Sequence, residues 1–142
     1  SPQVEQERIS SRPAMQDEQA SLQGAPATVT EIRRIRSING APCALEISVV
    51  SADLFPGLER RSPLPSALYV LYQQAYGCII LNADESIAAE QPDAETRQAL
   101  TLPADTPVLR VERVAHDILG RSVERRLSFF RTDQLNYMIR LD

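Results

Sequence analysis

Two arginines spaced two residues apart, Arg34 and Arg36, are the feature of this sequence that most suggests binding chemistry. The alternation of apolar and polar residues predicts a β-strand over residues 28–38, and residues two apart in a strand project from the same face. Two guanidinium groups on one face can converge on a single carboxylate or phosphate through charge-assisted hydrogen bonds. The alternative is a solvated strand face whose arginines pair with acidic side chains. Arg33 falls on the opposite face, where a surface or salt-bridging role is expected.

Whether Glu46 can join these arginines depends on the turn between two strands. A second strand is predicted over residues 43–50, and Asn39-Gly40 before it is a strong hairpin-turn signal. A two-residue turn would pair Glu46 with Arg33, whereas a three-residue loop would pair it with Arg34. A site that Glu46 shares with Arg34 therefore requires the odd-length loop.

Prolines and glycines divide the rest of the chain into short elements. Further strands are predicted over residues 4–12, 78–90, 107–115 and 122–130, and short helices over residues 15–22, 66–76 and 92–100. Strands joined in hairpins, with three helices between them, indicate an α+β domain with a mainly antiparallel sheet.

These elements occur twice in the same order, because residues 7–55 resemble residues 85–135. The matched pairs are Ile9 with Ile87, Leu22 with Leu100, Val29 with Val108, Ile32 with Val111, Gly40 with Gly120 and Asp53 with Asp133. A shared local pattern without common ancestry is the alternative. Two pseudo-repeated halves, residues 4–53 and 82–133, each reading strand, helix and hairpin, would build one sheet with a cleft at their junction.

The composition is that of a single globular domain of 142 residues, with 43% hydrophobic and 24% charged residues. No run approaches the eighteen or so apolar residues of a membrane span. All 15 basic residues are arginines, yet the net charge is −4, which disfavours nucleic-acid binding by this chain alone. Cys43 and Cys78 have neither metal-site nor disulfide-framework spacing, so two buried thiols in a reducing cytoplasm are expected.

Three runs of sequence carry a resemblance to a known family. They are RRIRSINGAPCALEISVV at residues 33–50, ALYVLYQQAYG at residues 67–77 and TPVLRVERVAHDILGRSVERRLSFFRTDQLNY at residues 106–137. Together, and in this order, they resemble the UTRA domain of HutC-like, GntR-family bacterial transcription regulators, over nearly all of residues 1–142. The resemblance implies a chorismate-lyase-like fold, a small intracellular metabolite as ligand, and homodimerisation. It also implies an N-terminal winged helix-turn-helix domain, which is absent from this chain.

The resemblance also implies which residues bind the ligand. Arg34 and Arg36 match the family's paired effector-anchoring arginines, and Glu46 matches an acidic residue that contacts hydroxyl or amine groups, with a simple ion pair to the arginines as the alternative. Glu124 and Phe130, six residues apart and so on one strand face, match a second pair of pocket positions. Phe130 stands where sugar-phosphate-sensing members carry tyrosine, and plain core packing is its alternative role.

The start of the predicted 66–76 helix departs from the family pattern. Ala67 stands where the Ser-Leu-Tyr motif has a serine, whose hydroxyl touches phosphate in those members. The helix N-terminus still offers unpaired N–H groups and a favourable dipole, and Ser66 can cap it or partly replace the lost hydroxyl. Tyr69 keeps the motif tyrosine, with core packing as the alternative. These departures favour an anion such as a carboxylate or a differently held phosphate, and weaken an aminosugar-phosphate assignment.

We therefore expect a small-molecule effector-binding and dimerisation domain of a cytoplasmic, DNA-binding transcription regulator that senses an anionic metabolite. Operator DNA would be bound only through the missing N-terminal domain, and no cofactor, metal or membrane partner is expected. An enzyme is not expected, since the sequence has no nucleophile motif, metal set or glycine-rich phosphate loop. The alternatives are a chorismate-lyase-like enzyme, whose chemistry depends mostly on positioning and arginines, and a dimerisation module that binds no ligand.

Overall fold

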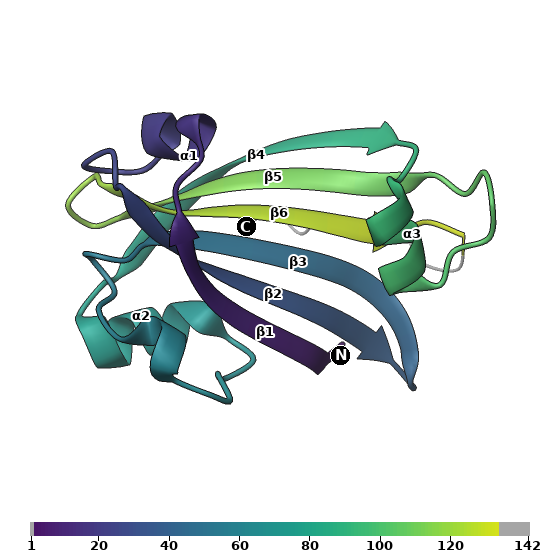
Figure 1. The fold of residues 1–142 in the computed structure, drawn as a ribbon, viewed down its shortest axis with the longest axis horizontal. Coiled ribbons are helices and arrows are strands. Elements are labelled where there is room, and N and C mark those ends of the chain that lie inside the picture. The colour runs from purple at the N-terminus through teal and green to yellow at the C-terminus, as the bar shows by residue number, and fades with distance from the viewer. Residues whose placement is uncertain (1, 134–142) are drawn as a thin grey trace.

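The computed structural model describes residues 2–133, which form a six-stranded antiparallel sheet with three short α-helices (Figure 1). The strands are β1 (Gln3–Pro13), β2 (Thr28–Ile38), β3 (Ala41–Ser51), β4 (Ile80–Glu90), β5 (Val108–Asp117) and β6 (Ser122–Arg131). The helices are α1 (Gln16–Ser21), α2 (Leu68–Tyr76) and α3 (Ala94–Leu100), with a 3-10 turn, η1, at Leu58–Arg60. The predicted α+β class with a mainly antiparallel sheet is confirmed. Residues 134–137, which belong to the third run of the family resemblance, lie outside the described residues.

The strand order β1-β2-β3-β6-β5-β4 sets the two halves of the chain side by side. The segments β1-α1-β2-β3 and β4-α3-β5-β6 both run strand, helix and hairpin, and they meet along the antiparallel pair β3–β6. The helix of each half packs across this junction, α3 against β3 and α1 against β6. Val29 and Val108 are both fully buried, while Gly40 and Gly120 both occupy left-handed turn positions with φ of 79° and 78°. The predicted pseudo-repeat is therefore confirmed.

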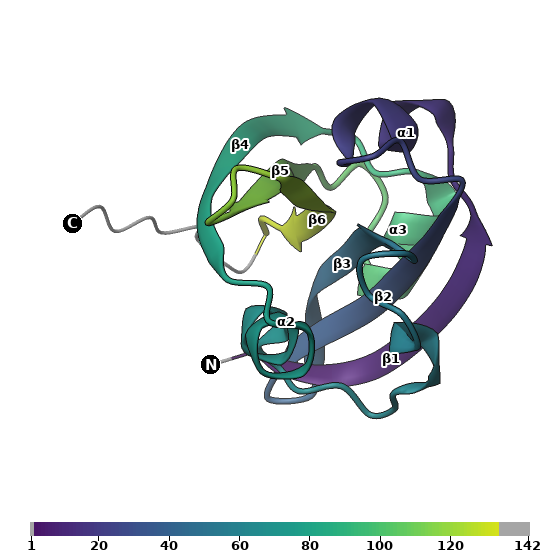
Figure 2. The same ribbon diagram turned by 90° about the vertical axis from the view of Figure 1, so that its left-hand side faces the viewer.

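Different elements cover the two faces of the sheet (Figure 2). On one face, here called the α1/α3 face, Leu100 of α3 packs with Leu45 and Phe129. On the other, here called the α2 face, Leu68 and Tyr72 of α2 pack against strand residues that include Ile32 and Val50. Because residues of β2 alternate between the faces, Arg34 and Arg36 share the α2 face with Ile32.

Helix α2 begins two residues later than the sequence predicts. Its first residue is Leu68 and its N-cap is Ala67, so Ser66 lies outside the helix. The carbonyl oxygen of Ser66 instead accepts hydrogen bonds from the side chains of Arg34 and Arg36 of β2, and these bonds hold Ser66 in the loop. The predicted glycine stop is confirmed, because Gly77 adopts a left-handed conformation with φ of 65° and its N–H donates to the Gln73 carbonyl at 3.0 Å.

Candidate functional site

The register of the β2–β3 hairpin sets Arg34 directly opposite Glu46. The Asn39-Gly40 turn has two residues, which by itself would bring Glu46 opposite Arg33. A β-bulge at Cys43 inserts one extra residue on β3 and shifts the register by one. The prediction that this pairing needs a three-residue loop is therefore wrong, but the pairing itself is present.

Arg34 is almost completely enclosed, with 1% of its surface exposed. Its Nε donates to Glu7 at 3.0 Å, and its two terminal nitrogens donate to the carbonyl oxygens of Ser66 at 2.9 Å and Pro65 at 2.6 Å. Burial lowers the pKa of the guanidinium, although the Glu7 carboxylate favours its charged form. Glu7 also accepts from the Leu64 N–H at 3.0 Å. Arg34 and Glu7 together therefore fasten the loop that precedes α2 to the sheet.

Arg36 lies beside Arg34 but nearer to solvent, with 17% of its side chain exposed. Its Nε donates to Glu46 at 2.6 Å, and its terminal nitrogens donate to the hydroxyl and carbonyl oxygens of Ser66 at 3.1 Å and 3.0 Å. The two arginines thus converge on one carbonyl oxygen of the chain itself, and their convergence on a ligand anion stays a prediction. Ser66 does not cap α2, since it precedes the N-cap residue Ala67, and its hydroxyl accepts from Arg36 instead.

The N-terminus of α2 has no side-chain cap. Ala67 at the N-cap position has no side-chain oxygen, and both it and Ser66 are exposed. The first backbone N–H groups of a helix have no acceptor within the helix, and the helix dipole favours negative charge there. An exposed, uncapped helix start beside Arg36 is a suitable position for an anion.

Glu124 lies deeper, with no exposed surface, and is held by the side chains around it. Tyr72 donates to it at 2.6 Å, Tyr69 at 3.3 Å and Arg126 at 3.0 Å. Burial raises the pKa of both tyrosines, and the Glu124 carboxylate raises it further, so both hydroxyls remain donors. Tyr69 is partly buried and combines core packing with a polar contact to this cluster.

Phe130 lies in the same row across the sheet as Arg36, with only Ala44 of β3 between them. It is partly exposed, and its other neighbour in the row is Leu109 of β5. Adjacent strands lie about 4.8 Å apart, so the backbones of Phe130 and Arg36 are about 10 Å apart. A ring at this position can form a wall beside a ligand held at Arg36.

The family profile for the UTRA domain matches residues 1–136 of this chain. The chain belongs to the UTRA domain family. Among its relatives, the HTH-type transcriptional repressor PhnF of Mycolicibacterium smegmatis is 27% identical over 114 residues, covering 80% of this chain and 46% of PhnF. The HTH-type transcriptional repressor NagR of Bacillus subtilis is 24% identical over 119 residues, covering 84% of this chain and 49% of NagR. The chain therefore spans about half the length of these relatives.

Solved structures with the same fold are also domains of such regulators. The effector domain of PhnF from Mycobacterium smegmatis superposes with a TM-score of 0.86 at 22% identity, covering 99% of this chain and 86% of that domain. The ligand-binding domain of a GntR-family transcriptional regulator from Bordetella bronchiseptica gives a TM-score of 0.86 at 24% identity, covering 100% of this chain and 91% of that chain. The UTRA domain described here is accordingly an effector-binding domain of the GntR type with the chorismate-lyase-like fold.

The UTRA domain brings two further arginines to the α2 face that the sequence analysis missed. The guanidinium of Arg126 lies 5.0 Å from the centre of the Tyr69 ring, and Arg113 donates to the Tyr69 hydroxyl at 3.3 Å. Strand parity could have identified Arg126, because it is two residues from Glu124 on the same strand. Arg113 becomes its neighbour only through the β5–β6 register, in which the two arginines are direct partners.

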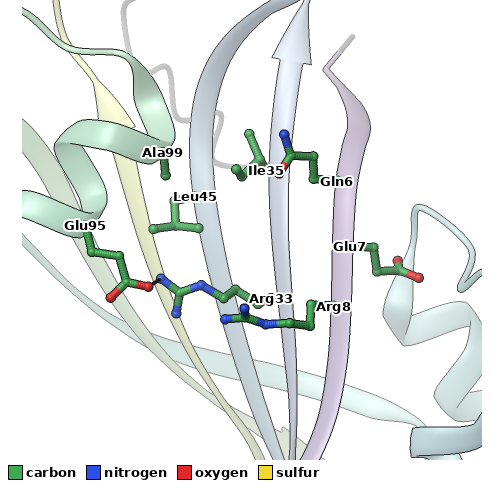
Figure 3. A pocket seen from close by; sticks show the side chains of 8 residues that line it. All are labelled: Gln6, Glu7, Arg8, Arg33, Ile35, Leu45, Glu95 and Ala99. Atoms are coloured by element: carbon green, nitrogen blue, oxygen red, sulfur yellow. Dashed lines mark hydrogen bonds and ion pairs between the residues drawn. The ribbon is translucent and has the colours of Figure 1, made fainter.

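The opposite face of the UTRA domain carries a separate hollow of about 260 Å³ under α3 (Figure 3). Arg33 lines it and forms an ion pair with Glu95 of α3, which confirms the predicted salt-bridging role on the face opposite Arg34. Figure 3 shows the Glu7 side chain extending to the other side of β1, toward α2. The paired arginines of the UTRA motif are therefore separated from this hollow by the sheet.

Within residues 2–133 no helix is long and apolar enough to cross a membrane. The same residues contain no cluster of three or more histidine, cysteine, aspartate or glutamate side chains suited to a metal ion. Both cysteines, Cys43 and Cys78, are buried and unpaired, as expected.

Proposed function

We propose that this UTRA domain senses a small anionic metabolite held at the start of α2. The observation that carries the proposal is the convergence of Arg34 and Arg36 on Ser66, next to an exposed helix N-terminus that has no side-chain cap. Charge-assisted hydrogen bonds from Arg36 and N–H groups of the first α2 turn would hold a carboxylate or phosphate there.

The remaining candidate residues act around this anchor. Arg34 positions the Ser66–Ala67 segment from beneath the site, and Glu46 orients Arg36 while offering a carboxylate oxygen to hydroxyl or amine groups of the ligand. Glu124 acts through Tyr69, whose hydroxyl it holds at 3.3 Å. Tyr69 and Phe130 form walls around the body of the ligand.

The domain would serve a longer, cytoplasmic regulator. We propose that it acts as a homodimer and that operator DNA is bound by an N-terminal winged helix-turn-helix domain not present in these 142 residues. The repressor names of PhnF and NagR, and the match to only about half of each, support this arrangement. They also favour regulation over the alternative of a chorismate-lyase-like enzyme. A ligand-free dimerisation module would have no need of the uncapped helix start.

The test is calorimetric titration of inorganic phosphate and acetate into the wild-type chain, Arg36→Gln and Arg60→Gln. Arg60 is a matched control, because its side chain is 79% exposed and forms an ion pair with the adjacent Glu59. One charge-assisted contact contributes about 1.5–3 kcal/mol, so Arg36→Gln should weaken anion binding by about ten- to a hundredfold. Arg60→Gln should bind as the wild type does. Equal affinities in all three proteins would mean that Arg36 belongs to an ordinary solvated strand face.

A further inference from the structure

Two rows of side chains on the α2 face occupy equivalent positions in the two halves of the sheet. The rows are Glu7, Arg34 and Glu46 across β1, β2 and β3, and Glu85, Arg113 and Arg126 across β4, β5 and β6. The internal repeat relates them, since Arg34 and Arg113 each follow the matched residues Ile32 and Val111 by two positions. Each half therefore carries its own version of the same three-residue row.

The two rows have the same residue types on their two outer strands, but they differ on the strand nearest the centre of the sheet. Arg34 donates to Glu7 at 3.0 Å, and Arg113 donates to Glu85 at 2.9 Å. The inner partner of Arg34 is the acidic Glu46, whereas the inner partner of Arg113 is Arg126. Like charges directly opposite each other on neighbouring strands destabilise a sheet. The second half thus places two guanidinium groups where the first half has an arginine and a carboxylate.

Each arginine of this pair has one carboxylate partner, Glu85 for Arg113 and Glu124 for Arg126, but these carboxylates leave one donor of Arg126 unsatisfied. Glu124 accepts from one terminal nitrogen of Arg126 at 3.0 Å, but it also accepts from Tyr72 at 2.6 Å. The Nε of Arg126 is buried, and among residues 2–133 it has no hydrogen-bond acceptor. Burial disfavours the charge of Arg126, but Glu124 outweighs it and raises the pKa of the guanidinium, which stays charged. A buried donor without an acceptor costs about 1–3 kcal/mol, so it indicates an acceptor supplied from elsewhere.

Tyr69 connects this pair to the anchor at Arg36. It is the second residue of α2 and lies three residues after Ser66. Its ring lies 5.0 Å from the Arg126 guanidinium and its hydroxyl accepts from Arg113 at 3.3 Å. The start of α2 therefore lies between two groups of arginines. Arg36 approaches it from the first half of the sheet, and the Arg113–Arg126 pair approaches it from the second half.

We propose that Arg113 and Arg126 form a second anion subsite, so that the effector of this domain carries two anionic groups. The inference rests on the proposed function, because it assigns the second end of a ligand whose first end is held at Arg36 and the α2 N-terminus. A carboxylate or phosphate bound between Arg113 and Arg126 offsets their repulsion and supplies the acceptor that the Nε of Arg126 lacks. The class of ligand is a short, linear metabolite with an anion at each end.

The experiment compares linear dicarboxylates from malonate to suberate with monocarboxylates of the same lengths, by calorimetric titration at constant ionic strength. In the wild-type chain, at least one dicarboxylate should bind tenfold or more tightly than the monocarboxylate of its length. Arg126→Gln should remove that preference while monocarboxylates still bind, whereas Arg36→Gln should weaken the binding of both classes of ligand. Arg113→Gln should also remove the preference, and it leaves the Arg126–Glu124 contact in place, so it controls for a folding defect.

The outcomes separate the two proposals. The second subsite is refuted if mono- and dicarboxylates of every length bind with equal affinity, or if neither binds. It is also refuted if both Arg113→Gln and Arg126→Gln keep the preference for dicarboxylates. If the preference is lost in those variants while Arg36→Gln binds as the wild type does, the anchor at Arg36 is refuted and the subsite stands.

Discussion

Replacing Arg34 with methionine tests whether Arg34 positions the loop before α2 or contacts the ligand directly. Methionine keeps much of the side-chain volume but removes the hydrogen bonds that join Arg34 to Glu7, Ser66 and Pro65. Removing one partner of a buried ion pair costs about 3–5 kcal/mol, because the other charge is left without compensation. The Glu7 side chain is 14% exposed, so water reaches its carboxylate and relieves part of that penalty. We expect the free energy of unfolding to fall by about 3 kcal/mol.

Urea denaturation followed by circular dichroism measures this change. With an m-value of about 1.5 kcal/mol/M, a loss of about 3 kcal/mol lowers the unfolding midpoint by about 2 M. The exposed control Arg60→Met should change the free energy of unfolding by less than about 0.5 kcal/mol. The double variant Glu7→Gln with Arg34→Met should lose less than the sum of the single variants, because no carboxylate is left unpaired. A loss below about 1 kcal/mol in Arg34→Met, together with a phosphate affinity as weak as that of Arg36→Gln, would refute the positioning role.

The other predictions concern acid stability and the turns. Burial favours the neutral form of Glu18, but two hydrogen bonds from Arg12 at 2.7 Å and one from the Met15 N–H at 2.8 Å outweigh it and hold its pKa below the ordinary value. Its stabilisation is therefore present above about pH 4.3 and lost as the pH falls through the folded pKa, so Glu18→Gln should lower thermal stability at pH 7 and change it little at pH 2. Equal losses at both pH values would contradict this. Gly40→Ala and Gly120→Ala should each lower the free energy of unfolding, measured by urea denaturation, by about 1–2 kcal/mol. The cost comes from the left-handed backbone alone, since φ is 79° and 78° and an added Cβ would meet nothing within 4 Å. Markedly unequal costs would mean that the two matched turns are not equivalent.

The elements and their order could be predicted from the sequence because they depend on local information. Alternation identified β2 and β3, the glycine at Gly77 marked the end of α2, and the repeat predicted two strand–helix–hairpin halves. The convergence of Arg34 and Arg36 follows from the same period of two residues. The family motifs then identified the effector-binding class, because they preserve residue types that a binding site needs.

The partners of each side chain could not be predicted in this way, because they depend on register and on contacts between distant segments. The bulge at Cys43 brings Glu46 opposite Arg34 although the turn has two residues, and no local pattern in the sequence requires it. The burial of Glu124 follows from α2 packing on the opposite half of the chain, which supplies both tyrosine donors. The pairing of Arg113 with Arg126 requires the β5–β6 register. Periodicity assigns a side chain to a face, but only the folded sheet and its covering helix determine which charges meet there and which donor is left without an acceptor.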